Sequence, residues 1–389
     1  MTARTLNRAL VAMAAAVTLT TAFTPSASAT ADPAQRGHTV TQAALEDQVK
    51  AGHPGVLAQV RDGNGVWNGS AGVADLETGR KRLSEDRFRI GSITKAFTSV
   101  AILQLEGEGR LDIDDTVEHL LPGVVRGNGY DGRKVTLRQL LNHSSGIFDY
   151  SDDQDFKHIA REGWPEHRYD AKTPNELVAM GLSNKPYFEP GAGWHYSNTN
   201  YVLAGLIIEK VTGKTYASEI ERRVIKPLGL RATSLPGIST KMPEPHGRAY
   251  SKLLSEAADA KIWDTTEITN TWVWAAGEII STTGDVNRFL GALLGGKLLP
   301  AKQQQELLTT VPTGDSGLAY GLGLYKYDLP CGGFVWTHGG GVHGSSSEAT
   351  SSPDGRHTMV FNANGDWAHI EAVKVLEAEY CGTPPPAQR

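Results

Sequence analysis

The chain has 389 residues, and its net charge of −5 arises from acidic and basic side chains that are mixed along its length. This length is enough for one large domain or two. The sequence has no run or cluster of Lys and Arg of the kind that binds nucleic acid, so nucleic acid is excluded as the expected partner.

The first 29 residues have the pattern of an export signal. Arg4 and Arg8 precede an apolar run over 9–22 that is too short to span a membrane as a stable helix. Small residues with the spacing of a cleavage site end at Ala29 and again at Ala31. We therefore expect a signal peptide over 1–29, cleaved near Ala29 or Ala31. The mature protein should be secreted, extracellular and soluble, without a stable membrane anchor.

The sequence holds two cysteines, Cys331 and Cys381. In an exported protein these thiols favour a disulfide. The bond would close a loop of about 50 residues, worth roughly 4 kcal/mol in the chain-entropy model. Two buried free thiols are the alternative.

Strand patterns occupy both ends of the chain, and helical patterns fill the middle. The N-terminal part predicts a helix over 41–51 and strands over 55–60, 66–74 and 87–90. The middle predicts helices over 137–142, 174–180, 201–211 and 216–224. The C-terminal part predicts helices over 283–294 and 371–380, and strands over 278–281, 320–327, 334–337, 345–351 and 357–362.

This order predicts one α/β domain that is built from the two ends of the chain. Its segments are expected at 38–110 and 265–389, and a mostly helical domain is inserted at 111–264. Residues 30–37 form a polar linker behind the signal. No internal repeat is visible.

The stretch from Arg89 to Lys95 carries the first candidate chemistry. It predicts a strand, a glycine turn and a helix that begins near Ser92, and the helix that follows is apolar on most sides, as buried helices are. Residues three apart share a helix face, so Ser92 and Lys95 are expected to meet. A lysine with a lowered pKa activates a serine hydroxyl. The alternative is a Ser92 that only caps the helix.

A second cluster lies in the glycine-rich turn over 190–200. Tyr196 offers a phenol that can carry a proton if a neighbouring lysine lowers its pKa. Asn198 offers an amide that can hold a substrate carbonyl or a lysine. The alternative is a plain helix cap beside a packed tyrosine.

A third cluster, over 337–344, contains His338, His343 and a run of glycines. Glycines at a strand end let a ligand approach the backbone closely. The alternatives are an incidental hairpin and the His-Gly-Gly-Gly loop of α/β-hydrolases, but that loop requires a Gly-x-Ser-x-Gly elbow that this sequence lacks. A metal site would need a third ligand beside the two histidines, and none is evident.

In their order and spacing, Ser-x-x-Lys, Tyr-Ser-Asn and His-Gly-Gly resemble the penicillin-binding serine hydrolases. This family includes the serine-type D-Ala-D-Ala carboxypeptidases and the class C β-lactamases. The resemblance covers nearly the whole mature chain. It extends to stretches over 87–92, 140–146, 188–191 and 320–324. It is strongest to the secreted DD-carboxypeptidases, which have a cysteine pair placed like Cys331 and Cys381 and a tryptophan placed like Trp272.

The resemblance implies a β-lactamase/DD-peptidase-like α/β fold, in which an antiparallel sheet is flanked by helices and a mostly helical domain is inserted. It implies that Ser92 forms an acyl-enzyme. Lys95 and Tyr196 would share the proton transfers, and either could be the base. No cofactor or metal is implied.

The resemblance also assigns the substrate contacts. Asn198 would hold the substrate amide, and the N–H groups of Ser92 and Gly341 would form an oxyanion hole. His338 would stand where relatives have Lys and keep the field around Tyr196 positive. Removing one oxyanion donor typically costs about a hundredfold or more in rate.

Two departures from the family bear on specificity. Its carboxypeptidases usually have a hydroxyl residue after the histidine, which helps to bind the terminal carboxylate of the substrate, and here the residue is Gly339. They also place an Arg on the neighbouring strand, where this sequence has Tyr325, Lys326 and Tyr327. Losing a bidentate Arg is not a conservative change.

We therefore predict a secreted serine hydrolase, foremost a D-alanyl-D-alanine carboxypeptidase that acts on peptidoglycan stem peptides and is acylated by β-lactams. Efficient hydrolysis of β-lactams is not indicated. The alternative within the family is a D-aminopeptidase, D-amino-acid amidase or esterase that acts on small D-amino-acid peptides. The alternative from another class is a non-catalytic module that binds cell wall or penicillin.

Overall fold

The computed structural model describes residues 37–255, 257, 259–367 and 371–382. The predicted signal peptide, its cleavage site and residues 30–36 of the predicted linker lie outside these residues. The division into an α/β domain and an inserted helical domain, at 110/111 and 264/265, stays a prediction.

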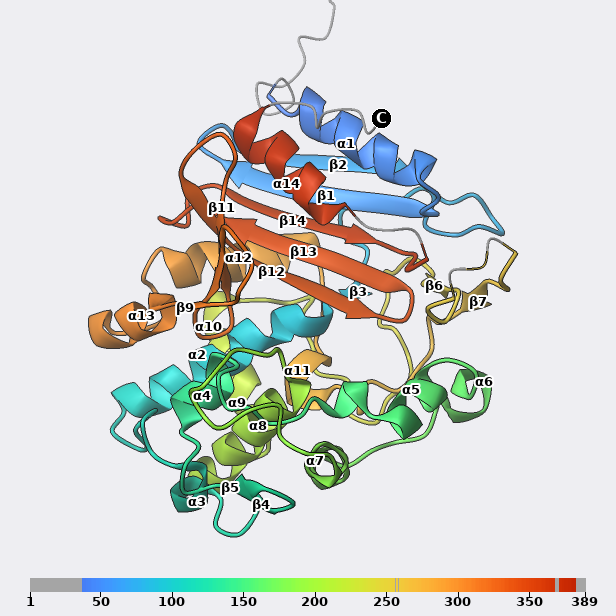
Figure 1. Ribbon diagram of the computed structural model, residues 1–389. Helices are drawn as coiled ribbons and strands as arrows, with labels where there is room; N and C mark the ends of the chain where they lie inside the picture. Colours follow the sequence, from blue (N-terminus) through green and yellow to red (C-terminus); the bar gives the residue numbers. More distant parts are fainter. Residues whose placement is uncertain (1–36, 256, 258, 368–370, 383–389) are drawn as a thin grey trace, which may run out of the picture. The chain divides into compact units, whose positions relative to one another are not determined.

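The central element is an eight-stranded antiparallel sheet in the order β2-β1-β14-β13-β12-β11-β10-β9 (Figure 1). Both ends of the chain contribute strands, and the β1–β14 pair joins them. This confirms the predicted antiparallel sheet with flanking helices. The strands of this sheet are β1 Gly55–Asp62, β2 Gly65–Gly72, β9 Val311–Pro312, β10 Leu318–Tyr320, β11 Tyr325–Asp328, β12 Phe334–Val342, β13 Ser345–Ser351 and β14 Thr358–Ala363.

Helices pack on both faces of the sheet. Side chains alternate between the faces, so Phe361 of β14 packs with α1 and α14, whereas its neighbour Val360 packs in the larger core with α2 and α12. Figure 1 shows α1 and α14 together along one side of β1 and β14. The helices near the sheet are α1 Thr39–Lys50, α2 Thr94–Gly107, α11 Trp274–Gly277, α12 Thr283–Leu294, α13 Ala301–Leu308 and α14 Ala372–Cys381.

The middle of the chain is mostly helical, as predicted. Its helices are α3 Val117–Leu120, α4 Leu137–Leu141, α5 Gln154–Ala160, α6 Trp164–His167, α7 Pro174–Ser183, α8 Asn198–Thr212, α9 Tyr216–Ile220 and α10 Lys226–Leu228. Single helical turns, η2 Gly91–Ile93, η3 Tyr150–Asp152 and η4 Glu221–Ile225, and small strand pairs complete the fold. The pairs are β3 Phe88–Arg89 with β8 Ile280–Ser281, β4 Arg126–Gly127 with β5 Tyr130–Asp131, and β6 Tyr250–Ser251 with β7 Trp263–Asp264.

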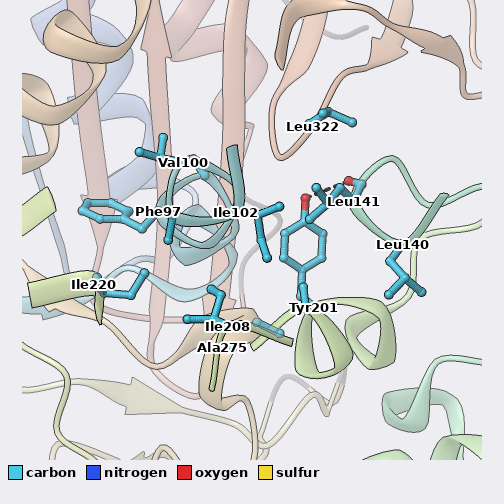
Figure 2. Packing of buried hydrophobic residues seen from close by; sticks show 14 of the residues in the cluster. Phe97, Val100, Ile102, Leu140, Leu141, Tyr201, Ile208, Ile220, Ala275 and Leu322 are labelled. Carbon is cyan, nitrogen blue, oxygen red and sulfur yellow. Dashed lines mark hydrogen bonds between the residues drawn. The ribbon is translucent and has the colours of Figure 1, made fainter. Parts of the chain in front are cut away.

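Helix α2 lies at the centre of the larger core. All of its residues except Gln104 and Gly107 are buried, which confirms the helix predicted to be apolar on most sides. Phe97 stacks on Phe289 of α12 with ring centroids 3.7 Å apart. Figure 2 shows Phe97 among the buried side chains of this cluster. Truncating such a buried aromatic ring costs about 3–5 kcal/mol, so this packing fixes α2 firmly.

Three predicted strands differ in the structure. The segment 320–327 is two strands, because the chain reverses at Gly323, whose φ of +89° suits glycine. The strand predicted to end at 337 continues through the glycines to Val342, because β13 pairs with it that far, and Gly340 there packs against Ile90 and Ser92. The strand over 87–90 is only β3, which pairs with β8 outside the main sheet.

The predicted disulfide between Cys331 and Cys381 is present, with Cα atoms 5.7 Å apart. Cys331 lies in the turn between β11 and β12, and Cys381 ends α14. The bond therefore ties the start of β12 to the C-terminal helix.

Candidate active site

Ser92 and Lys95 meet at the start of α2, as their spacing predicts. Ser92 lies in the single turn η2 and Lys95 in the first turn of α2, and the lysine Nζ is 3.0 Å from the serine Oγ. Gly91, with φ of +52°, makes the turn from β3 into this helical start. The first N–H groups of a helix have no partner within it, which leaves donors beside Ser92.

Lys95 is fully buried and held by neutral partners. Its Nζ donates to Oδ1 of Asn198 and to the carbonyl of Ala276, both at 2.8 Å, and lies 4.8 Å from the ring centre of Tyr196. Burial lowers the pKa of Lys95 to about 7, against the opposing charge of Asp149. With this pKa about half of the Lys95 side chains are unprotonated at pH 7, and the unprotonated form can accept a proton from Ser92.

Asn198, the first residue of α8, has both ends of its amide occupied. Its Oδ1 accepts from Lys95, and its Nδ2 donates to Oδ2 of Asp149 at 3.0 Å and to Oγ of Ser151 at 3.3 Å. Burial raises the pKa of Asp149, while hydrogen bonds from Ser151 and Asn198 and the lysine charge act against that rise. In this structure the amide that was expected to hold substrate holds Lys95.

Tyr196 is half-buried between Ser92 and two imidazoles. Its ring lies 4.3 Å from the ring of His143 and 6.3 Å from that of His338. Burial raises the pKa of Tyr196 well above its ordinary value, the Tyr325 phenol adds to the rise, and a hydrogen bond with Ser92 acts against it. The sequence made proton transfer by this phenol conditional on a lowered pKa, and burial here raises the pKa instead.

His338 does not carry the positive charge that the resemblance implied. Its Nε2 is 3.1 Å from the Tyr320 hydroxyl and its Nδ1 is 2.6 Å from the carbonyl of Gly339. Burial lowers the pKa of His338 to about 3, and the charge of Lys95 lowers it further. The imidazole is therefore neutral and fixed by its two partners.

The glycine run of β12 lies against the backbone of Ser92. A Cβ atom on Gly340 would lie 1.9 Å from the Ile90 carbonyl oxygen and 3.1 Å from the Ser92 nitrogen. A Cβ atom on Gly91 would lie 2.7 Å from the Gly341 nitrogen. Only glycines permit this contact, and it brings the Gly341 nitrogen close to Gly91, the residue before Ser92.

The second half of β12 has a free edge. Its first half pairs with β11 from Phe334 to Thr337, where that pairing ends, and β13 continues on the other side to Val342. The backbone groups of residues 338–342 on the free edge can therefore bind an extended ligand as an added strand.

A cavity of about 440 Å³ lies beside Ser92 at the Val342 end of this edge. Its lining is mainly apolar and includes Tyr150, Phe156, Trp164, Trp272, Val342 and His343. Trp272 is held by the bond from its Nε1 to the Asp170 carbonyl and lies 5.6 Å from the Phe156 ring. Trp272 therefore lines this cavity, whose volume lies within the range of small-ligand pockets.

Three contributors to the site were missed from the sequence. Asp149 reaches Asn198 from a loop with no motif of its own, so nothing in the sequence indicated it. Gly340 was noted only as one glycine of a run. Glu348 lies opposite Gly339 on β13. Its only signal in the sequence was an acidic residue within a predicted strand of small residues, where an unpaired carboxylate is uncommon.

Within the described residues, no cluster of three His, Cys, Asp or Glu side chains could hold a metal ion. The same residues include no helix with the length and apolar character needed to span a bilayer.

The fold and the buried serine–lysine pair define a serine hydrolase of the penicillin-binding type. A family model described as Beta-lactamase matches residues 41–370, and the chain belongs to this family of penicillin-binding serine hydrolases, which confirms the resemblance in sequence. Penicillin-binding protein 4* of Bacillus subtilis (strain 168) is 30% identical over 319 residues, covering 80% of this chain and 68% of that protein.

Two solved structures are similar over most of the chain. A D-stereospecific amidohydrolase from Streptomyces sp. is 51% identical, with a TM-score of 0.84, covering 89% of this chain and 99% of that one. The D-amino acid amidase from Ochrobactrum anthropi SV3, complexed with D-phenylalanine, is 26% identical, with a TM-score of 0.75, covering 88% of this chain and 99% of that one.

Proposed function

We propose that the protein is a D-stereospecific amidohydrolase, which cleaves the amide bond on the carbonyl side of a D-amino-acid residue with a large apolar side chain. The observation that carries this proposal is the apolar, aromatic cavity beside Ser92, which suits a single side chain next to the scissile carbonyl. The high identity to the Streptomyces amidohydrolase supports the D-configuration. This is the in-family alternative drawn from the sequence.

In the proposed acylation step, neutral Lys95 removes the Ser92 proton as Oγ attacks the substrate carbonyl. The distance of 3.0 Å between Nζ and Oγ is within hydrogen-bonding range for that transfer. The raised pKa of Tyr196 makes a phenolate base unfavourable, so the phenol acts as a neutral relay that hands a proton to the leaving nitrogen and receives one from Lys95. The amide C–N bond breaks and an ester to Ser92 remains.

The Ser92 and Gly341 N–H groups stabilise the oxyanion in this scheme. Donors that are fixed before the reaction lose no energy to reorganisation as charge develops. In the deacylation step a water molecule takes the place of the leaving amine, gives its proton to Lys95 and attacks the ester. Oγ recovers a proton as the D-amino acid departs, so the enzyme returns to its initial state.

A D-alanyl-D-alanine carboxypeptidase acting on peptidoglycan stem peptides is the second candidate. It is favoured by the similarity to penicillin-binding protein 4*. We also propose that the protein is secreted, which the disulfide between Cys331 and Cys381 supports, since such bonds persist in oxidising compartments.

The deciding experiment compares D-phenylalanine amide with L-phenylalanine amide, and both with a D-Ala-D-Ala peptide. We expect D-phenylalanine amide to be hydrolysed fastest, with the L-amide at background, and Ser92→Ala to abolish the activity while keeping the melting temperature. Equal rates on the two enantiomers would refute D-specificity, and a preference for D-Ala-D-Ala would favour the carboxypeptidase. Wild-type protein that is inactive on all three and forms no covalent adduct with labelled penicillin would be a non-catalytic binding module.

A further inference from the structure

The two ends of the free β12 edge lie on different sides of Ser92. Val342 and His343 line the apolar cavity, which receives the acyl part of a substrate. His338 and Gly339 lie at the other end, beside Tyr196, from which the leaving nitrogen takes its proton. In the proposed pose the scissile carbonyl oxygen of the substrate lies at the Ser92 and Gly341 nitrogens. The leaving group of an extended substrate then runs past His338 and Gly339.

A carboxyl group lies at this second end. Glu348 of β13 is the cross-strand partner of Gly339, and directly paired residues project from the same face of a sheet. A Cβ atom on Gly339 would lie 2.9 Å from Oε2 of Glu348. The missing side chain at 339 therefore leaves room that Glu348 fills. The Thr337 hydroxyl donates to Oε1 and fixes the carboxyl group there.

The groups around Glu348 do not neutralise it. Tyr325 of β11 is a neutral phenol with a pKa raised by burial and by Glu348 itself. His338 of β12 is a neutral imidazole on the opposite face, and the partner on β14 is the apolar Phe361. Lys326, the cation that the sequence offered for this place, pairs instead with Asp328 at 3.1 Å and lies over the Phe334 ring.

We propose that Glu348 is a specificity-determining residue that selects substrates whose leaving group is neutral or cationic and disfavours leaving groups with a free carboxylate next to the scissile bond. This inference rests on the proposed amidohydrolase function. It names the preferred leaving groups as those that carry an amide, an ester or an amine in place of a free carboxylate. Like charges brought together at a site reduce binding of the wrong partner, which is how such a side chain discriminates.

The selection should depend on pH. Burial raises the pKa of Glu348 to about 7, with the Thr337 hydroxyl acting against the rise. Below that pH the carboxyl group is mostly protonated and tolerates a carboxylate, and above it two negative charges meet. The discrimination against a carboxylate leaving group therefore grows as the pH rises through about 7.

The test uses D-phenylalanyl-glycine and D-phenylalanyl-glycinamide, with product analysis counting only cleavage of the Phe–Gly bond. The readout is the ratio of their kcat/KM values from pH 5.5 to 9 on one protein preparation. Partial inactivation of the enzyme and titration of the α-amino group, which both substrates carry, affect both values equally and cancel in the ratio. We expect wild-type protein to favour the glycinamide by about ten- to a hundredfold at high pH, and by less at low pH.

Glu348→Gln and Glu348→Ala should both bring the ratio closer to one and remove its pH dependence. Glu377→Gln is the matched control, because Glu377 accepts from Tyr327 of the same β11 strand at 2.9 Å and is not placed at the site. A ratio in both Glu348 variants equal to the wild-type ratio at every pH would overturn the inference alone. Absence of cleavage of D-phenylalanine amide and of both dipeptides would overturn the proposed function, and the inference with it.

Discussion

The two sides of Ser92 are built by different parts of the chain. The acyl side is an apolar cavity whose aromatic walls, Tyr150, Phe156 and Trp164, come from the helical middle of the sequence. The side proposed for the leaving group is made by β11, β12 and β13, where Gly339 pairs with Glu348. Recognition of the side chain and recognition of the leaving group can therefore change independently, while the chemistry between them stays the same.

A change in the catalytic groups between the two sides should lower the rate on every substrate. Lys95→Ala removes the proposed base, and Tyr196, whose pKa is raised by burial, is a poor substitute, so we expect kcat to fall by at least about a thousandfold on every substrate. The measurement is kcat for D-phenylalanine amide and for D-phenylalanyl-glycinamide. Unequal losses on the two substrates would mean that Lys95 also serves one side specifically.

Gly340 and Gly341 provide a matched pair for the backbone between the two sides. A methyl group on Gly340 would collide with the Ile90 carbonyl and push β12 away from Ser92, whereas one on Gly341 meets nothing within 4 Å. We expect Gly340→Ala to lower kcat by about a hundredfold, as loss of an oxyanion donor does, and Gly341→Ala to be much milder. Similar losses in both variants would contradict the close approach.

Substitution of Trp272 should change only the selectivity for the side chain in the cavity. Truncating it to alanine removes one wall of the cavity, so we expect kcat/KM for D-phenylalanine amide to fall by about tenfold, while D-alanine amide changes little. The ratio between the glycine and glycinamide dipeptides should stay at its wild-type value. A shift in that ratio would show that the two sides are coupled.

The pH dependence of kcat should be the same for all substrates, whichever side of Ser92 distinguishes them. Lys95 is the base only when unprotonated, and burial lowers its pKa to about 7. We therefore expect kcat to rise by about tenfold between pH 6 and 8 and then to level off. The same profile should appear for amide and ester substrates, and a flat profile over this range would contradict the assignment of Lys95.

Glu278, beneath the site, should change stability without changing either recognition. Its pKa is raised by burial to about 7, so the folded protein binds its proton more tightly than the unfolded chain does. Stability is then highest below about pH 4.5 and falls as the pH rises to about 7, by about 3 kcal/mol. Glu278→Gln should lack this component in denaturant unfolding, while exposed Glu189→Gln follows the wild type.

Local signals in the sequence predicted the catalytic centre better than its surroundings. The spacing of Ser92 and Lys95 and the apolar character of α2 are properties of consecutive residues, and both were confirmed. The neutral His338 and the raised pKa of Tyr196 follow from burial by distant segments, which motif reasoning cannot count. Glu348 became visible only through the register of β12 and β13.

The same limit explains the errors in the strands. Glycine is disfavoured in strands, so the run over 339–341 was expected to end one. It continues because β13 pairs with it to Val342, and at Gly340 the contact with Ile90 and Ser92 demands glycine, a requirement that exists only once the start of α2 is packed there.

The pairing of β1 with β14 has a consequence for how the protein is made. Val56 in β1 pairs with Ala363 in β14, so the β1–β2 hairpin cannot join the rest of the sheet until the ribosome has delivered both segments. Contacts so distant in sequence form slowly. During most of synthesis the chain therefore lacks this strand pair, and an incompletely folded chain is the state that an export channel for unfolded polypeptides can thread.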